Sequence, residues 1–122
     1  MIRGNIFKNW NKTCYIASKK SIDTDDYGNE INKYNKPIKY TFNIQPAGGD
    51  FDIALYGEKI SKIYRAIVPY SYKDKIKEGD IAYLDGSLPE EQEPYGDNAN
   101  YIVDSIRPQN LAMAIYFKKR EN

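Results

Sequence analysis

Alternation of apolar and polar side chains is the clearest signal in the chain, and its period is that of a half-buried β-strand. In residues 39–46 and again in residues 110–119, apolar side chains recur at every second position. Three shorter runs, at residues 13–18, 81–84 and 101–106, are rich in β-branched and aromatic residues and are bounded by turn formers. The pattern predicts five strands, and the residues expected to supply much of the core are Tyr40, Phe42, Ile44, Ile81, Tyr83, Val103, Leu111, Met113, Ile115 and Phe117.

Residues 57–69 are ambiguous, because their isoleucines also fit the stripe of a helix. The β-branched content favours a strand at residues 62–68, with a short helix or turn before it, and Pro69 stops either element. Elsewhere we find no segment that predicts a helix of any length.

Three polar connections separate the strands, at residues 23–37, 46–52 and 87–100. Loops of this length are uncommon in compact domains and usually either bind a partner or lack order. Short strands, little helix and long loops together predict an all-β fold, a small antiparallel β-barrel or sandwich, formed by one domain over residues 1–122.

The stretch "KIKEGDIAYLDG", residues 75–86, contains two carboxylates and two glycines that resemble a catalytic loop. A structural interpretation explains them better. Gly79 supplies the positive φ of a corner, and Asp80 can accept hydrogen bonds from nearby backbone N–H groups. Asp85 and Gly86 form a second turn dipeptide, so the stretch is predicted to be turn, strand and turn.

Composition excludes several classes of chemistry. The chain has no histidine and a single cysteine, so it can form neither a Ser-His or Cys-His relay nor an internal disulfide. Cys14 is expected to be a small buried strand residue. The 18 basic and 17 acidic residues nearly cancel, so the protein has no strong positive potential that would attract nucleic acid. No apolar run approaches the length of a membrane span. We therefore expect no enzymatic activity, no cofactor and no membrane contact.

The segment "DTDDYGNEINKY" resembles a calcium loop at its first, third and sixth positions, which are Asp23, Asp25 and Gly28. Its fifth and twelfth positions are Tyr27 and Tyr34, where calcium needs oxygen donors and a closing glutamate. We predict a solvated loop without a metal.

Charged clusters suggest partner contacts rather than catalysis. Glu90 and Glu91 lie between prolines, without apolar neighbours that would raise a carboxyl pKa for acid–base work. Basic residues gather at 19–20 and 118–120, and Tyr15 and Tyr116 lie near them in sequence. An oligonucleotide-binding barrel that stacks single-stranded nucleic acid on these tyrosines is therefore the alternative function, although the near-neutral charge weighs against it.

The order of four segments resembles a known family: "LYGEKISKIYRAIV", "KIKEGDIAYLDG", "ANYIVDSIRPQN" and "LAMAIYFKKR". It is similar to the small head–tail connector proteins of tailed bacteriophages, also called head-closure, stopper or head-completion proteins. The shared pattern is a Gly-Asp corner before an aromatic strand, a Tyr-x-Val strand, and a last strand that runs into basic residues. It covers residues 56–120, whereas the N-terminal part departs from the family.

The resemblance implies a structural virion protein, assembled in the host cytoplasm, that forms a homo-oligomeric ring of about twelve subunits at the head–tail interface. Such a ring lies below the portal or adaptor protein and above the tail terminator or another tail protein. It closes the portal channel after DNA packaging, and genomic DNA passes through it. The twelve tyrosines suit such interfaces. The candidate partner contacts are Asp25, Asp26, Tyr27, Tyr34, Phe51, Glu90, Glu91 and Tyr95.

Overall fold

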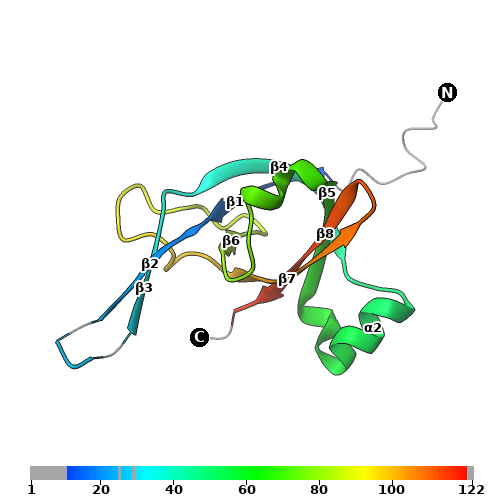
Figure 1. Cartoon of the computed structure of the whole chain (residues 1–122), viewed down its shortest axis with the longest axis horizontal. Coiled ribbons are helices and arrows are strands. Elements are labelled where there is room, and N and C mark those ends of the chain that lie inside the picture. Colours follow the sequence, from blue (N-terminus) through cyan, green and yellow to red (C-terminus); the bar gives the residue numbers. More distant parts are fainter. Residues whose placement is uncertain (1–10, 25, 29, 121–122) are drawn as a thin grey trace.

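The computed structural model describes residues 11–24, 26–28 and 30–120 (Figure 1). The strands in this part of the chain are β1 (Asn11–Ala17), β2 (Lys19–Thr24), β3 (Glu30–Tyr34), β4 (Ile38–Pro46), β5 (Ile63–Pro69), β6 (Ile81–Tyr83), β7 (Tyr101–Gln109) and β8 (Ala112–Lys119). The helical elements are α2 (Asp50–Tyr56) and the 3-10 helices η1 (Gly57–Lys62) and η2 (Tyr70–Asp74).

Six antiparallel strands close on themselves as a barrel in the order β1-β4-β5-β8-β7-β6. The ring closes because β1 pairs with β4 along one edge and with the short β6 along the other. All five predicted strands are present, and the strand predicted at residues 62–68 is β5, preceded by η1 as expected. The all-β prediction is confirmed.

The barrel interior is a single apolar cluster to which all six strands contribute. Period-two alternation places every second side chain of each strand inside, which explains why the pattern was readable in the sequence. Cys14 is buried there as a small strand residue, as predicted. The buried members are Cys14, Ile16, Phe42, Ile44, Ala66, Val68, Ile76, Ala82, Leu84, Tyr101, Val103, Met113, Ile115 and Phe117.

Strands β6 and β8 are buried on both faces, because other segments cover them from outside. On the outer face of β5 and β8, Ala47 and Tyr56 pack against Tyr116 and its neighbours. On the outer face of β6, Ile81 and Tyr83 form a second cluster that includes residues of the 87–100 connection and of β3. The predicted alternation in β8 holds, but both of its faces are apolar and buried.

The core prediction was wrong for Leu111, which is 90% exposed. Gln109 pairs directly with Ala112, so Asn110 and Leu111 form the turn between β7 and β8. Asn110 has a φ of 55°, the left-handed conformation that asparagine tolerates in such turns. Tyr40 is only half-buried and packs at the edge of the core, while the other predicted core residues are buried.

The connection at residues 23–37 is not the long loop that the sequence suggested. β2 and β3 pair there as a separate two-stranded antiparallel sheet, which extends away from the barrel (Figure 1). An isolated two-stranded ribbon has little apolar face to bury, so no clear alternation marks it in the sequence.

The other two connections differ from each other. Residues 46–52 were predicted to be a loop, but α2 begins at Asp50. No helical stripe marks α2 in the sequence, because its apolar residues Phe51, Ile53 and Leu55 lie at every second position. The helix is instead fixed by a polar contact that is described below. Residues 87–100 contain neither helix nor strand, as predicted.

The stretch at residues 75–86 is the predicted turn, strand and turn. Gly79 has a φ of 95°, and the buried Asp80 accepts hydrogen bonds from the backbone N–H groups of Lys77 (2.9 Å) and Lys19 (3.2 Å). Burial raises the pKa of Asp80, and these hydrogen bonds partly offset that rise. Asp85 and Gly86 form the second turn, with φ values of 56° and 84°. The corner is therefore architectural.

Replacing Gly96 by alanine tests how the 87–100 connection is fitted to the barrel. Gly96 has a φ of 117°, and an added Cβ would lie 2.8 Å from the Ile81 Cδ1 atom and 3.0 Å from the Tyr34 Cδ2 atom. We expect Gly96→Ala to lower the free energy of unfolding by about 1–3 kcal/mol from the backbone conformation alone, as measured by urea denaturation.

Gly48→Ala is the matched control, because a Cβ at Gly48 meets nothing within 4 Å. Equal effects of the two substitutions would contradict this account of Gly96.

Candidate interaction surfaces

α2 is held on the outside of the barrel by a buried carboxylate. Asp52 is 1% exposed, and its Oδ2 atom accepts hydrogen bonds from the Gly48 N–H group and from the Arg65 guanidinium, both at 2.9 Å. Its Oδ1 atom accepts one from the Tyr116 hydroxyl at 2.7 Å. Arg65 in β5 and Tyr116 in β8 are register partners, so one carboxylate ties the helix to two neighbouring strands.

A second contact joins α2 to β7. The Tyr56 hydroxyl donates to the Asp104 carboxylate at 3.0 Å and shares a hydrogen bond with the Ser105 hydroxyl at 2.9 Å. Burial and the nearby Asp104 carboxylate raise the pKa of Tyr56 to about 12, although the Ser105 hydrogen bond lowers it, so the phenol stays protonated. Both ends of the short helix are thus fixed to the sheet.

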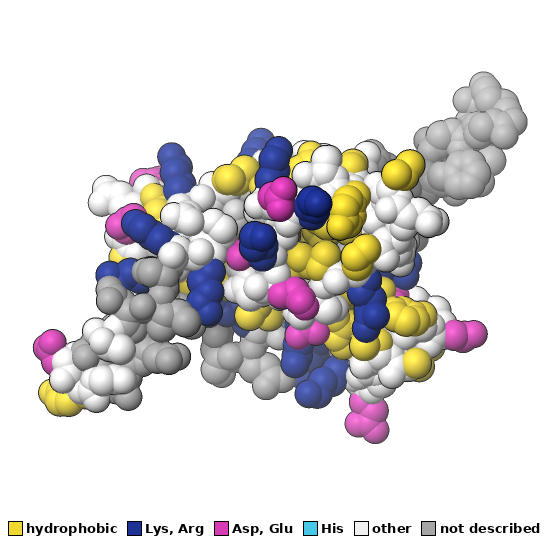
Figure 2. All heavy atoms as spheres, viewed as in Figure 1, with side chains coloured by type: hydrophobic (Ala, Val, Ile, Leu, Met, Phe, Trp, Pro, Cys, Tyr) yellow, Lys and Arg dark blue, Asp and Glu magenta, His cyan; other side chains and the backbone are white. Residues whose placement is uncertain are grey.

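Three apolar side chains of α2 are exposed, on different sides of the helix, and the exposed Asp50 lies in the same helix. Phe51 is 55% exposed, Ile53 53% and Leu55 38%, and the Arg107 guanidinium lies over the Phe51 ring at 4.8 Å. Figure 2 shows hydrophobic side chains gathered over this part of the molecule, around β5, β8 and α2. Phe51, a predicted partner contact, is therefore available to a partner, together with two residues that the sequence did not single out.

The tip of the β2–β3 hairpin is a second exposed surface. Asp26 and Tyr27 lie there, with Tyr27 90% exposed, and both were predicted contacts. Asp25 lies outside the described residues. Tyr34, also predicted as a contact, is half-buried at the base of the hairpin against the outer cluster of β6. There it braces the hairpin against the barrel, and its role as a partner contact stays a prediction.

In the 87–100 connection, Glu90 is engaged inside the molecule. Its carboxylate accepts hydrogen bonds from the Tyr83 hydroxyl at 2.7 Å and from the Asn98 backbone N–H at 2.9 Å. Burial alone would raise the pKa of Glu90, but these donors outweigh it, so the pKa lies below its ordinary value. The two other predicted partner contacts in this connection differ from Glu90 in exposure: Glu91 is exposed and Tyr95 is half-buried.

Further hydrogen bonds close this connection onto the barrel. Asn100 exchanges side-chain hydrogen bonds with the backbone of Leu84, at 2.8 and 2.7 Å. The Arg120 guanidinium donates to the carbonyls of Gly96 (2.7 Å) and Ala99 (3.0 Å). The connection is an ordered cover over β6, with Glu91 on its outer side.

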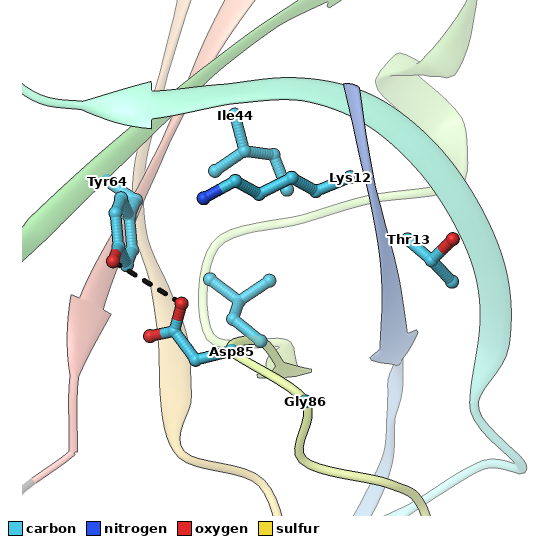
Figure 3. A pocket seen from close by; sticks show the side chains of 7 residues that line it. Lys12, Thr13, Ile44, Tyr64, Asp85 and Gly86 are labelled. Carbon is cyan, nitrogen blue, oxygen red and sulfur yellow. Dashed lines mark hydrogen bonds between the residues drawn. The ribbon is translucent and has the colours of Figure 1, made fainter. Parts of the chain in front are cut away.

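One end of the barrel holds a cavity of about 170 Å³ (Figure 3). Asp85 accepts hydrogen bonds there from the hydroxyls of Tyr64 (3.3 Å) and Tyr101 (3.2 Å), and the Lys12 ammonium lies 5.7 Å from the centre of the Tyr64 ring. Burial, reinforced by the Asp85 carboxylate, raises the pKa of both tyrosines. The tyrosines remain hydrogen-bond donors, and the cavity is smaller than the sites that enclose cofactors.

The described residues contain no group of three or more Cys, Asp and Glu side chains that could hold a metal ion. Burial raises the pKa of Cys14 to about 12, which keeps it a thiol and unreactive. No helix in the part of the chain that the structure describes is long and apolar enough to cross a membrane. The surfaces, rather than a pocket, are the candidate functional sites.

The sequence did not identify Asp52, Ile53, Leu55 or Arg107 as part of a surface. The one local signal was the acidic residue within the apolar run "FDIAL" after two glycines, since an acid among apolar residues is often buried with a partner. The partners Arg65 and Tyr116 are distant in sequence, and nothing local marks them.

Replacing Asp52 by asparagine tests the anchor of α2. The amide keeps one acceptor oxygen and loses the ion pair, in which Arg65 is 31% exposed. We expect the free energy of unfolding in urea to fall by about 1–3 kcal/mol. Asp50→Asn is the matched control, because it removes an exposed carboxylate from the same turn. Equal losses in both variants would show that the buried carboxylate is not the anchor.

Acidification tests the role of Glu90. Because its folded pKa is depressed, Glu90 contributes stability above the pKa of an unfolded glutamate, about 4.3, and this is lost as the pH falls through the folded pKa. Glu90→Gln should therefore be less stable at pH 7 and lose less stability on acidification than the parent, in urea titrations at several pH values. Glu91→Gln should keep the parent's pH dependence; if Glu90→Gln also keeps it, the assignment is wrong.

No family model matches this chain, and no curated protein or solved structure matches it either. The functional argument rests on the residues and surfaces described above.

Proposed function

We propose that this protein is a structural virion protein of a tailed bacteriophage, a subunit of a ring at the head–tail interface. The observation that carries the proposal is the arrangement of its two protruding elements, α2 and the β2–β3 hairpin. A closed barrel holds α2 at one end of its long axis and the β2–β3 hairpin at the other (Figure 1). A subunit with two different contact surfaces at opposite ends is suited to head-to-tail association, which closes into a ring when the rotation permits.

The resemblance of residues 56–120 to the connector proteins supports a position between the head and the tail of the phage particle. These residues form η1 and the strands β5 to β8, most of the barrel wall, while the hairpin lies in the part of the chain that departs from the family pattern. In the proposed ring the barrel forms the wall of the channel. The portal or adaptor protein lies above it, the tail terminator or another tail protein below, and the genomic DNA passes through.

The contact surfaces suit assembly by binding alone. Tyr27 and Phe51 are exposed aromatic residues, the type that dominates the energy of protein interfaces. Near-neutral net charge avoids strong repulsion between identical subunits. We propose that the protein acts without a catalytic step and without a cofactor.

The alternative, an oligonucleotide-binding barrel, loses one of its expected features. Tyr116, expected to stack on bases beside the C-terminal basic residues, is 1% exposed beneath α2. Arg120 of that basic cluster is engaged by two backbone carbonyls. Lys118 and Lys119 still line an open surface depression with Asp104, so the alternative calls for a direct test.

The decisive experiment is to locate the chain in a reconstruction of the phage particle. We expect it in a symmetric ring between capsid and tail. Its absence from particles, or its presence only in the infected cytoplasm, would refute the proposal.

A salt titration separates the two functions in solution. A nucleic-acid binder should hold single strands with an affinity that falls steeply as salt rises, because counterions are released on binding. We expect only weak binding, measured by fluorescence anisotropy with a labelled oligonucleotide. Tight, salt-dependent binding that Lys118→Ala/Lys119→Ala abolishes would favour the alternative.

A further inference from the structure

Charged residues are unevenly distributed along the second half of the chain. Residues 78–104 contain eight Asp and Glu residues and no Lys or Arg. Residues 105–120 contain four Lys and Arg residues and no Asp or Glu. The near-neutral net charge of the protein hides this division, and the fold decides where each sign of charge is exposed.

The 87–100 connection exposes part of the acidic segment in a fixed conformation. The side chains of Glu91, Glu93 and Asp97 are exposed. Glu90 turns inward instead, and its hydrogen bonds hold the connection against the barrel. Because the backbone is already ordered, a partner that binds these three carboxylates does not have to order it. We call Glu91, Glu93 and Asp97 the acidic patch.

The end of β8 exposes the opposite charge. Three basic residues, one acidic residue and one isoleucine line an open depression of about 360 Å³, and they are Lys118, Lys119, Arg120, Asp104 and Ile102. The Asp104 carboxylate accepts a hydrogen bond from Tyr56 of α2. The depression therefore has an excess of positive charge. We call Lys118, Lys119 and Arg120 the basic patch.

The two patches adjoin each other. The Arg120 guanidinium donates to the carbonyls of Gly96 (2.7 Å) and Ala99 (3.0 Å), so the end of β8 lies against the connection. Among the described residues, the ammonium groups of Lys118 and Lys119 form no ion pair with the carboxylates of the acidic patch. Opposite charges therefore lie side by side on the surface without pairing within the chain.

We propose that the basic patch is the docking surface for the acidic patch of a second copy of this chain, in a twofold contact. Adjoining patches of opposite charge are self-complementary about a twofold axis, because each copy then places its acidic patch on the basic patch of the other. The inference goes beyond the proposed ring and does not depend on it, since neither patch includes a residue of α2 or of the hairpin.

The acidic patch also argues against nucleic acid as the occupant of the depression. A nucleic acid brings only negative charge, so it is attracted at the basic patch and repelled at the adjoining acidic patch. A second copy brings both signs of charge, and each patch meets its opposite. Charge complementarity therefore favours the protein partner.

The contact should be weak and sensitive to salt. Ion pairs between exposed side chains each contribute little, because water screens them and long side chains lose freedom on pairing. The screening length falls from about 30 Å at about 0.01 M salt to about 10 Å at about 0.1 M. We expect a dimer at high protein concentration and low salt whose dissociation constant rises several-fold over this range.

Charge reversal tests the pairing by sedimentation equilibrium. Lys118→Glu/Lys119→Glu reverses the sign of the basic patch, and Glu91→Lys/Glu93→Lys reverses that of the acidic patch. Each variant alone should be a monomer at low salt, because patches of like charge would meet. An equimolar mixture of the two variants should form a heterodimer, because each patch again meets its opposite, and this heterodimer should weaken with salt as the parent dimer does.

A control separates the patches from net charge. Lys36→Glu/Lys39→Glu changes the net charge as much as the first variant, at exposed positions outside both patches. It should still dimerise and should not pair with Glu91→Lys/Glu93→Lys more tightly than the parent does. Equal pairing of the control would overturn the inference, as would a parent that stays monomeric at low salt or a mixture without heterodimer.

Two further measurements complete the test. Circular dichroism checks that each variant is folded, and Lys119→Glu alone, on an exposed side chain, serves as the milder substitution. A monomeric parent that binds a labelled single strand, and loses this binding in Lys118→Glu/Lys119→Glu, would assign the basic patch to nucleic acid and overturn the inference. A neck ring in particles without a dimer in solution would overturn the inference alone. A dimer formed by a protein absent from particles would refute the proposed function alone.

Discussion

The whole barrel depends on a strand of three residues. Among the described residues, β6 (Ile81–Tyr83) is the one strand that pairs with both β1 and β7, so the ring opens if β6 detaches. Such a short ladder supplies few hydrogen bonds, and the molecule compensates by burying β6 on both faces. Asp80 fixes the corner before it, while Glu90 and Asn100 hold the following connection against it. The conformation of residues 87–100 thus follows from the need to close the sheet.

The outside of the barrel is organised differently around Asp52. A carboxylate with three donors determines how α2 lies, together with the packing of Tyr56 against Tyr116. The usual order of burial is therefore inverted: the charge is inside and the apolar residues are outside. This arrangement costs little within the fold, because the ion pair is satisfied, and it leaves Phe51, Ile53 and Leu55 exposed.

The barrel and the two elements that protrude from it, α2 and the β2–β3 hairpin, have different roles in the fold. The barrel wall, with its filled interior, positions both elements rigidly at a distance from each other. The hairpin is braced at its base by Tyr34 and α2 packs through Tyr56, while both elements leave aromatic side chains exposed. The polar groups at the cavity near Asp85 are satisfied within the barrel, because the hydroxyls of Tyr64 and Tyr101 donate hydrogen bonds to the Asp85 carboxylate.

The sequence by itself determined the barrel strands and most of the core, because period-two alternation in residues 39–46 and 112–119 follows directly from the pleat of a strand. It also determined the glycine corners, which depend on backbone conformation alone. Only the tertiary structure decided that Leu111 belongs to a turn, that Glu90 faces inward and that α2 buries Asp52 while Phe51 is exposed. Each of these is set by partners distant in sequence, such as Tyr116 for Asp52, and no local pattern encodes a contact of that kind.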